Sequence, residues 1–333
     1  KNLSICLLAM KSALITGATG FIGANLAREL ARRKFIVNIL TRPKSNLWRL
    51  SDIKDKIIIH NADVLDFNRL SAVVHEIKPK YIFHLAAYGA YPRIETDEKA
   101  ILETNAIGTY NLLKATLDIP YSCFINTGSS SEYGTKNKAM KESDALEPNT
   151  FYGAAKAAAT MLCQNFARQY KKPIVTLRPF AAYGYYEEHF RLVPDVIINC
   201  INQKDVHLTS GEQKRDFVFI EDVIDAYMKA TEKPLSGIVL NVGSGSDVSV
   251  KEVASLIHRL IKSKNKLLFG KKSKEQFETD ICWKADTAAI KKNLGWQAET
   301  SLISGLKKTI EWFRQNMEVY ERNHPIRKKL NRD

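Results

Sequence analysis

The sequence has few cysteines and no long apolar run. Its five cysteines are scattered and form no CxxC pair: Cys6, Cys123, Cys163, Cys200 and Cys282. This spacing argues against a disulfide framework and a structural zinc, and it favours a reducing, cytoplasmic location. No grouping of His, Cys, Asp and Glu has metal-ligand spacing, so we expect no metal. No apolar stretch approaches the roughly 20 residues of a membrane helix, so we expect no membrane span.

Internal repeats and low-complexity linkers are also absent, and only the C-terminal tail concentrates charge. The formal net charge is +14, but the lysines are spread as on a solvated surface, so we expect no nucleic-acid partner. Residues 1–9 precede Met10, which stands just before a typical first strand, and we interpret them as a leader or an extension. The basic residues 322–333 are interpreted as a frayed end.

What the chain does contain is enough apolar material for a sizeable core. Of its 333 residues, 45% are hydrophobic and 26% are charged, and this length favours two domains or one large elaborated one. Apolar runs predict strands at 12–17, 35–41, 56–63, 81–87, 122–128 and 174–180. Amphipathic patterns predict helices at 21–33, 69–77, 100–117 and 151–170.

These strands are apolar throughout rather than alternating, which predicts a parallel sheet covered on both faces in a doubly wound α/β fold. We predict one domain over residues 10–178, completed by segments near 215–245, and a smaller mixed C-terminal domain over 179–333. The second domain is expected to hold helices at 192–203, 221–233, 250–263 and 302–315, and short strands at 206–210 and 237–243.

A glycine-rich turn follows the first predicted strand. It reads TGATGFIG and places Gly17, Gly20 and Gly23 in a GxxGxxG pattern. Glycines here let the backbone turn tightly and approach a pyrophosphate, which rests on the unpaired N–H groups of the next helix. The turn therefore predicts a dinucleotide site, the alternative being a plain tight turn.

The second strand ends without an acidic residue. NAD-binding sheets usually place Asp or Glu there, to accept hydrogen bonds from the adenosine ribose. This chain has Thr41 and Arg42 instead, and an arginine can bind a 2′-phosphate. Arg42 thus predicts NADP(H), with NAD(H) as the alternative if Arg42 only flanks the site. Asp63 and Val64, after the third strand, are expected to line the adenine pocket.

Two further stretches carry hydroxyl and amino groups. Tyr152 and Lys156 are four residues apart on a predicted helix and share one face. A nearby ammonium is expected to lower the pKa of the tyrosine and make it a usable acid or base. By itself such a pair is usually an ordinary exposed helix face. The serines of TGSSSEYG, residues 127–134, are either a solvated turn or hydroxyls aimed at a substrate.

Taken together, the motifs of this chain resemble the extended short-chain dehydrogenase/reductase family, the nucleotide-sugar epimerases and dehydratases. The resemblance implies a Rossmann domain that binds NAD(P), a C-terminal domain that binds a nucleoside-diphosphate sugar, and a homodimer. It covers residues 11 to about 315. The motifs appear in the family's order: TGATGFIG, HLAA, TNAIGT, SSSEYG, YGAAK, RPFAAYG, GEQKRDFVFIEDV and NLGW.

The resemblance implies a role for each matching residue. Tyr152 would be the catalytic acid or base, Lys156 would bind the nicotinamide ribose and tune Tyr152, and Ser129 would hydrogen-bond the reacting sugar oxygen. Tyr152 and Lys156 also count among the cofactor-binding residues. Further cofactor contacts implied are Phe21, Ile22, Leu85, Ala86, Ala87, Thr127 and Pro179.

Substrate contacts are implied as well. Arg215 corresponds to the arginine that grips the diphosphate, unless it is a surface arginine paired with Asp216. Ser130 and Arg191 are expected to line the sugar pocket. At Ala181 the chain departs from the family, which often has a phosphate-binding asparagine there.

Family dehydratases carry acidic residues in the two places after the reactive hydroxyl. Here those places hold Ser130 and Ser131, and Glu132 comes one position late. Glu132 would face the other way if strand geometry continued. A 4,6-dehydratase is therefore disfavoured.

Two reactions fit Ser129, Tyr152 and Lys156. An NADPH-dependent 4-ketoreductase is favoured by Arg42, and a 4-epimerase with tightly bound NAD is the alternative. A third reading is a non-catalytic NADP-binding sensor, whose signature would be loss of the tyrosine or the lysine. Both are present.

Overall fold

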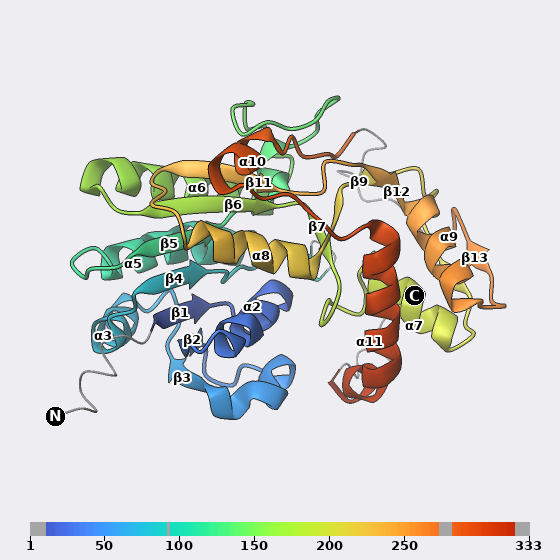
Figure 1. Ribbon diagram of the computed structural model, residues 1–333, viewed down its shortest axis with the longest axis horizontal. Coiled ribbons are helices and arrows are strands. Elements are labelled where there is room, and N and C mark those ends of the chain that lie inside the picture. The colour runs from blue at the N-terminus through green and yellow to red at the C-terminus, as the bar shows by residue number, and fades with distance from the viewer. Residues whose placement is uncertain (1–10, 92–93, 273–281, 324–333) are drawn as a thin grey trace.

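The computed structural model describes residues 11–91, 94–272 and 282–323 (Figure 1). Residues 1–9 and 324–333, interpreted above as a leader or extension and as part of a frayed end, lie outside the described residues, as does Cys6. The other four cysteines are free thiols. Within the described ranges, no helix is long and apolar enough to cross a membrane, and no three His, Cys, Asp or Glu side chains gather as a metal site would.

A seven-stranded parallel sheet forms the centre of the molecule, as the sequence predicts. Its strand order is β11-β6-β5-β4-β1-β2-β3, so the order reverses between β1 and β4. In such sheets, ligands bind outside the carboxyl ends of the strands at this reversal. The strands are β1 Ser12–Thr16, β2 Ile36–Thr41, β3 Ile57–Asn61, β4 Tyr81–His84, β5 Cys123–Thr127, β6 Ile174–Pro179 and β11 Ile238–Val242.

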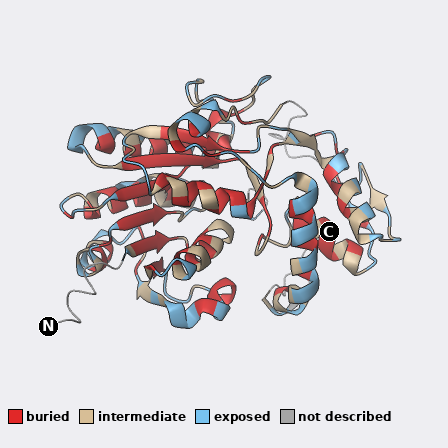
Figure 2. Cartoon of the chain, viewed as in Figure 1, coloured by how far each residue is buried: buried red, intermediate tan, exposed pale blue. Residues whose placement is uncertain are grey.

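Helices cover both faces of this sheet because successive strand residues point to opposite sides. From β1, Ala13 and Ile15 pack into one core and Leu14 into the other. Figure 2 shows the central strands as buried between these layers. The first core includes residues of α2 (Phe21–Arg32) and α8 (Ile220–Ala230). The second includes residues of α3 (Phe67–Ile77), α5 (Gly108–Ala115) and α6 (Phe151–Tyr170).

The later part of the chain forms helices and short strand pairs at one end of the molecule (Figure 1). There α7, α9 and α11 pack against one another. The helices at this end are α7 Leu192–Ile201, α9 Val250–Ile261 and α11 Leu302–Asn323, whereas α10 Ala288–Leu294 packs against β11 and α8. The pairs are β7 Ala181–Tyr183 with β10 Phe217–Phe219, β9 Lys214–Arg215 with β12 Val248–Ser249, and β8 Val206–His207 with β13 Leu267–Leu268. The division at residue 179 stays a prediction.

Two local elements differ from the expected ones. The helix predicted over 100–117 is α4 (Glu98–Leu102), a π-helical turn η2 (Glu103–Ile107) and α5. Asn105 lies in the π turn, and its amide donates to the carbonyls of Tyr88 and Ile101. A side chain that reaches outside its own helix in this way is compatible with the wider turn. The segment after β2 forms an unpredicted 3-10 helix, η1 (Trp48–Lys56).

Candidate active site

The glycine turn is closed by backbone contacts that only glycine allows. Gly17 has a φ of +72°, and a Cβ there would lie 2.4 Å from the carbonyl carbon of Leu85 and 2.5 Å from the nitrogen of Ala86. A Cβ on Gly23 would lie 2.2 Å from the oxygen of Gly17. Gly20 starts α2 without a side-chain cap, and the first turn holds no acid. The N–H groups of this helix end are thus open to an anion, so the turn fits a pyrophosphate.

The other expected cofactor residues follow the ends of parallel strands and therefore share the same edge of the sheet. Phe21 and Ile22 open α2, Ala87 follows β4, Thr127 ends β5 and Pro179 ends β6. The Thr127 hydroxyl lies 2.7 Å from the hydroxyl of Tyr227.

The part of this edge where we expect the adenine carries Arg42 on the surface. Thr41, the last residue of β2, is buried, and Arg42 is exposed just beyond it. The Asp63 carboxylate accepts the N–H of Leu65 at 2.9 Å. Val64 is buried, and its side chain fills the space beside Gly108. The Arg42 side chain is therefore accessible to solvent, as a side chain that binds a ligand phosphate must be.

Ser129 and Tyr152 meet, although they come from different elements. Ser129 caps the 3-10 helix η3 (Ser130–Tyr133), which follows β5. Tyr152 lies in the first turn of α6, and the Ser129 side chain acts on its phenol to lower its pKa. A Cβ on Gly153 would lie 2.5 Å from the carbonyl oxygen of Ser131, so this glycine allows α6 to approach the serine turn. Lys156 follows one turn later and is buried.

The electrostatics of this pair differ from the expectation. Burial raises the pKa of Tyr152 to about 12, although the nearby Ser129 side chain acts to lower it. Burial also lowers the pKa of Lys156 to about 8, against the opposing effect of Glu132. The prediction that the ammonium lowers the pKa of Tyr152 is therefore wrong for this structure, because loss of hydration dominates. Tyr152 keeps its proton at neutral pH.

Glu132 points into the protein rather than toward a ligand. It is fully buried, and its Oε2 lies 2.8 Å from Nε and 2.7 Å from Nη2 of Arg178. Its Oε1 accepts the N–H of Ser129 at 2.8 Å. The expected direction is thus observed, but its cause is the capping box of η3 and not a continued strand.

Ser130 is held by a residue that sequence reasoning missed. The indole N–H of Trp283 donates to the Ser130 hydroxyl at 3.0 Å. The guanidinium of Arg215 lies 5.3 Å from the centre of the same indole ring. Trp283 thus links the serine turn to the expected diphosphate arginine. No sequence signal joins residues so far apart along the chain.

Asp216, the alternative partner of Arg215, has a structural role. Its carboxylate is buried and accepts N–H groups of Ser244, Gly245 and Ala285, at 2.6, 3.0 and 3.0 Å. This position does not fit a surface ion pair with Arg215.

Arg191 lies at the start of α7, near enough to Tyr152 for its charge to act on the phenol. Its guanidinium is 5.7 Å from the ring centre of Tyr91, and its Nε is 3.8 Å from Glu187. Its positive charge lowers the pKa of Tyr152. Burial raises the pKa of Glu187 to about 8.

Arg49 is a second residue that sequence reasoning missed. It is 5% exposed. Its Nε donates to the carbonyl of Tyr186 at 2.8 Å and its Nη1 to that of Thr19, in the glycine turn, at 3.2 Å. Its Nη2 lies 2.6 Å from the carboxylate of Glu188. Arg49 therefore joins η1, the glycine turn and the segment that leads to Arg191.

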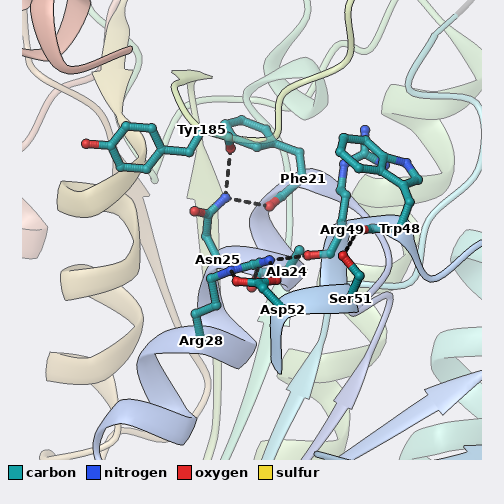
Figure 3. Close-up of polar contacts among 9 residues, drawn as sticks. All are labelled: Phe21, Ala24, Asn25, Arg28, Trp48, Arg49, Ser51, Asp52 and Tyr185. Atoms are coloured by element: carbon teal, nitrogen blue, oxygen red, sulfur yellow. Dashed lines mark hydrogen bonds and ion pairs between the residues drawn. The ribbon is translucent and has the colours of Figure 1, made fainter. Parts of the chain in front are cut away.

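Figure 3 shows how η1 and the segment at Tyr185 are fastened to α2. Asn25 donates to the carbonyls of Phe21 and Tyr185, at 2.9 and 3.0 Å. Arg28 pairs with Asp52 of η1. These contacts hold the first turns of α2 against two segments from distant parts of the chain.

Comparisons with known proteins agree with this geometry. A model described as the NAD dependent epimerase/dehydratase family matches residues 13–243. The chain is 28% identical to a dTDP-glucose 4,6-dehydratase of Haemophilus influenzae, over 91% of this chain and 98% of that protein. It is 29% identical to a UDP-N-acetyl-alpha-D-glucosaminuronate decarboxylase of Bacillus cytotoxicus, over 92% and 98%.

A solved UDP-glucuronic acid 4-epimerase from Bacillus cereus, in complex with UDP-glucuronic acid and NAD, has a TM-score of 0.81 to this chain. It is 26% identical and covers 91% of this chain and 99% of its own. The region matched by the family model runs from β1 to the end of β11 and so contains the glycine turn, Ser129, Tyr152 and Lys156. The chain therefore belongs to the NAD dependent epimerase/dehydratase family, a family of enzymes.

Proposed function

We propose that this protein is an NADPH-dependent reductase of a 4-keto nucleoside-diphosphate sugar. The observation that carries the proposal is the close packing of the Ser129 turn on the first turn of α6, which places Ser129 beside Tyr152, with Lys156 one helical turn away. When bound, the nicotinamide supplies the hydride. Tyr152 gives its proton to the sugar oxygen, Ser129 donates a hydrogen bond to the same oxygen, and Lys156 supplies positive charge beside them. Tyr152 is neutral at pH 7, the form that this proton transfer needs.

The preference for NADPH rests on the end of β2. Residues 41–47 contain no acid that would accept hydrogen bonds from a ribose or repel a 2′-phosphate. Arg42 is exposed at this place. Because a reductase must exchange its oxidised cofactor in every turnover, an NADPH site favours reduction.

The substrate class is proposed from the relatives and from Arg215. The relatives named above carry nucleotide sugars in their names. Arg215 presents a guanidinium, which can bind a diphosphate with two hydrogen bonds. Its stacking on Trp283 orients that group beside the serine turn.

A second candidate is a 4-epimerase with bound NAD. The solved 4-epimerase with NAD favours it, and the same three residues would serve. A 4,6-dehydratase is not favoured, although a dehydratase is among the relatives. The Ser130 and Ser131 side chains are hydroxyls, and the Glu132 carboxylate is bound to Arg178.

We further propose a cytoplasmic homodimer that meets through α4, η2, α5 and α6. These elements pack side by side. They expose several large apolar side chains: Leu102 at 43%, Ile107 at 52%, Tyr110 at 41% and Met161 at 55%. Apolar side chains gathered on neighbouring helices are typical of an interface.

The experiment that tests the proposed reaction follows NADPH oxidation with 4-keto-6-deoxy sugars linked to different nucleoside diphosphates. We expect one equivalent of NADPH to be oxidised per sugar reduced. NAD retained through purification, together with interconversion of 4-epimers and no net cofactor consumption, would show the epimerase instead. Cofactor binding without turnover of any sugar nucleotide would show the sensor.

A further inference from the structure

Glu132 is a buried charge that the proposed chemistry does not use. Its side chain is completely buried, and one carboxylate oxygen accepts a hydrogen bond from Nε of Arg178 at 2.8 Å and forms an ion pair with Nη2 at 2.7 Å. Burying such a pair is costly, and removing one partner usually destabilises a protein strongly. A buried ion pair that touches the catalytic turn therefore calls for a reason other than stability.

The pair belongs to a polar network that reaches two strands. Nη1 of Arg178, on β6, donates to the Tyr133 hydroxyl at 2.8 Å. That hydroxyl donates to Asn241, on β11, at 2.7 Å. The Asn241 N–H in turn donates to Glu142 at 2.7 Å. The Glu132 carboxylate is thus held in one place beneath Ser129.

The Glu132 carboxylate also acts on the ammonium of Lys156, which is buried like the carboxylate itself, and raises its pKa. The other groups that act on Lys156 or are acted on by it are Cys163, on α6, and His84, on β4. Burial raises the pKa of Cys163, so its thiol stays neutral. His84 is neutral as well, because burial lowers its pKa to about 3. Among these groups, the negative charge opposite Lys156 comes from Glu132.

We propose that Glu132 is a positioning residue for the catalytic trio: its carboxylate fixes the backbone of Ser129 and supplies the counter-charge of the Lys156 ammonium. The proposal deepens, and rests on, the proposed role of Ser129, Tyr152 and Lys156. Glu132, which follows the three serines, would thus have a role different from that of the acidic residues in family dehydratases.

The sign of the effect follows from the charges around the two titrating groups. Glu132 raises the pKa of Lys156, and it also raises that of Tyr152. Tyr152 further faces Ser129, Glu95 and Arg191, none of which the variants below alter. Removing the negative charge must lower both values. Lys156 would then lose its proton at a lower pH. Any part of the pH–rate profile that depends on the protonation of Lys156 or Tyr152 would shift to lower pH.

The test is to titrate Lys156 directly, by NMR of the apoenzyme with carbon-13 at the lysine ε position. The resonance missing in Lys156→Met identifies the signal. We expect Glu132→Gln to lower its midpoint by roughly one pH unit or more. Glu142→Gln is the matched control: it removes a half-buried carboxylate of the same network that acts on Tyr133 and not on Lys156. Its midpoint should equal that of the wild type.

Two further variants separate the roles and guard against unfolding. Glu132→Asp keeps the negative charge, but its shorter side chain should lose the hydrogen bond to the Ser129 N–H. The titration midpoint of Lys156 should therefore stay unchanged while turnover falls. If Glu132→Gln does not fold, Glu132→Gln combined with Arg178→Met removes both charges of the ion pair and should still lower the pKa midpoint of Lys156.

An unchanged midpoint in the folded Glu132→Gln or double variant, or an equal shift in Glu142→Gln, would overturn the proposal. Because the titration needs no substrate, its outcome is independent of whether a 4-keto sugar is turned over. A wild type that fails in the reductase assay would thus count against the proposed function alone.

Discussion

Tyr152 carries its proton at neutral pH, because burial holds its pKa near 12. This protonation state suits a residue that delivers a proton to a carbonyl oxygen. We expect Tyr152→Phe to lower turnover by roughly a hundredfold or more and to leave cofactor affinity nearly unchanged, since only proton transfer is lost. Ser129→Ala should cost less, because it removes one hydrogen bond. The measurement is single-turnover kinetics beside a cofactor titration, and near-normal turnover of Tyr152→Phe would refute the mechanism.

Arg42, also at the scale of a single residue, carries the proposed preference for NADPH. If it contacts a 2′-phosphate, the protein should bind NADPH roughly tens of times more tightly than NADH, because a charge-assisted hydrogen bond contributes about 1.5–3 kcal/mol. Arg42→Ala should remove this preference by weakening NADPH alone. Lys44→Ala, which removes another exposed cation of the same loop, is the control. Equal affinity of the wild type for both cofactors would favour the epimerase.

Between elements, Arg215 and Trp283 join β9 to the serine turn. Arg215→Ala is expected to raise KM for the sugar nucleotide by about tenfold or more, because a charge-assisted contact to the diphosphate is lost. Cofactor affinity should stay the same. The control is Lys214→Ala, which removes the neighbouring exposed cation and should change neither KM nor cofactor affinity. Steady-state kinetics and a cofactor titration measure this. Equal weakening of both ligands would place Arg215 in a structural role instead.

The second junction between elements is Arg49, which ties η1 to the glycine turn and to Glu188. Arg49→Met leaves the Glu188 carboxylate and two carbonyls without a buried partner, so we expect a loss of about 3 kcal/mol in unfolding free energy. Cofactor affinity should fall as well, since the carbonyl of Thr19 loses its donor. Urea unfolding and a cofactor titration measure the two effects. Arg32→Met, which removes a surface pair with Glu29, should change neither, and an equally stable Arg49→Met would refute the role.

The whole molecule presents apolar side chains on α4, η2, α5 and α6. We expect Ile107→Asp and Met161→Glu to convert the proposed dimer into a monomer, because a charge buried between two copies is costly. Light scattering after size exclusion measures the mass. Ile303→Asp changes an equally exposed residue, 50%, on α11 and should leave the dimer intact. A wild type that is already monomeric would contradict the proposal.

The sequence by itself determined the central architecture. Apolar runs joined by helices predict a parallel sheet with two buried faces. Consecutive residues of a strand point to opposite faces, so a strand buried on both faces is apolar at every position. The turn at Gly17 and the spacing of Tyr152 and Lys156 are likewise local patterns. A short sequence window therefore suffices to predict the tight glycine turn and the helix that carries Tyr152 and Lys156.

Only the tertiary structure decided which distant groups meet at the site and how they titrate. Trp283 reaches Ser130, Arg49 reaches Thr19 and Glu188, and Glu132 finds Arg178. No periodicity or residue spacing in the sequence predicts these contacts, because each forms only when two elements pack against one another. The pKa of Tyr152 moved opposite to the expected direction for the same reason. The spacing along the helix predicts that a charged residue lies near the phenol. The loss of hydration that raises its pKa depends on every side chain packed around it.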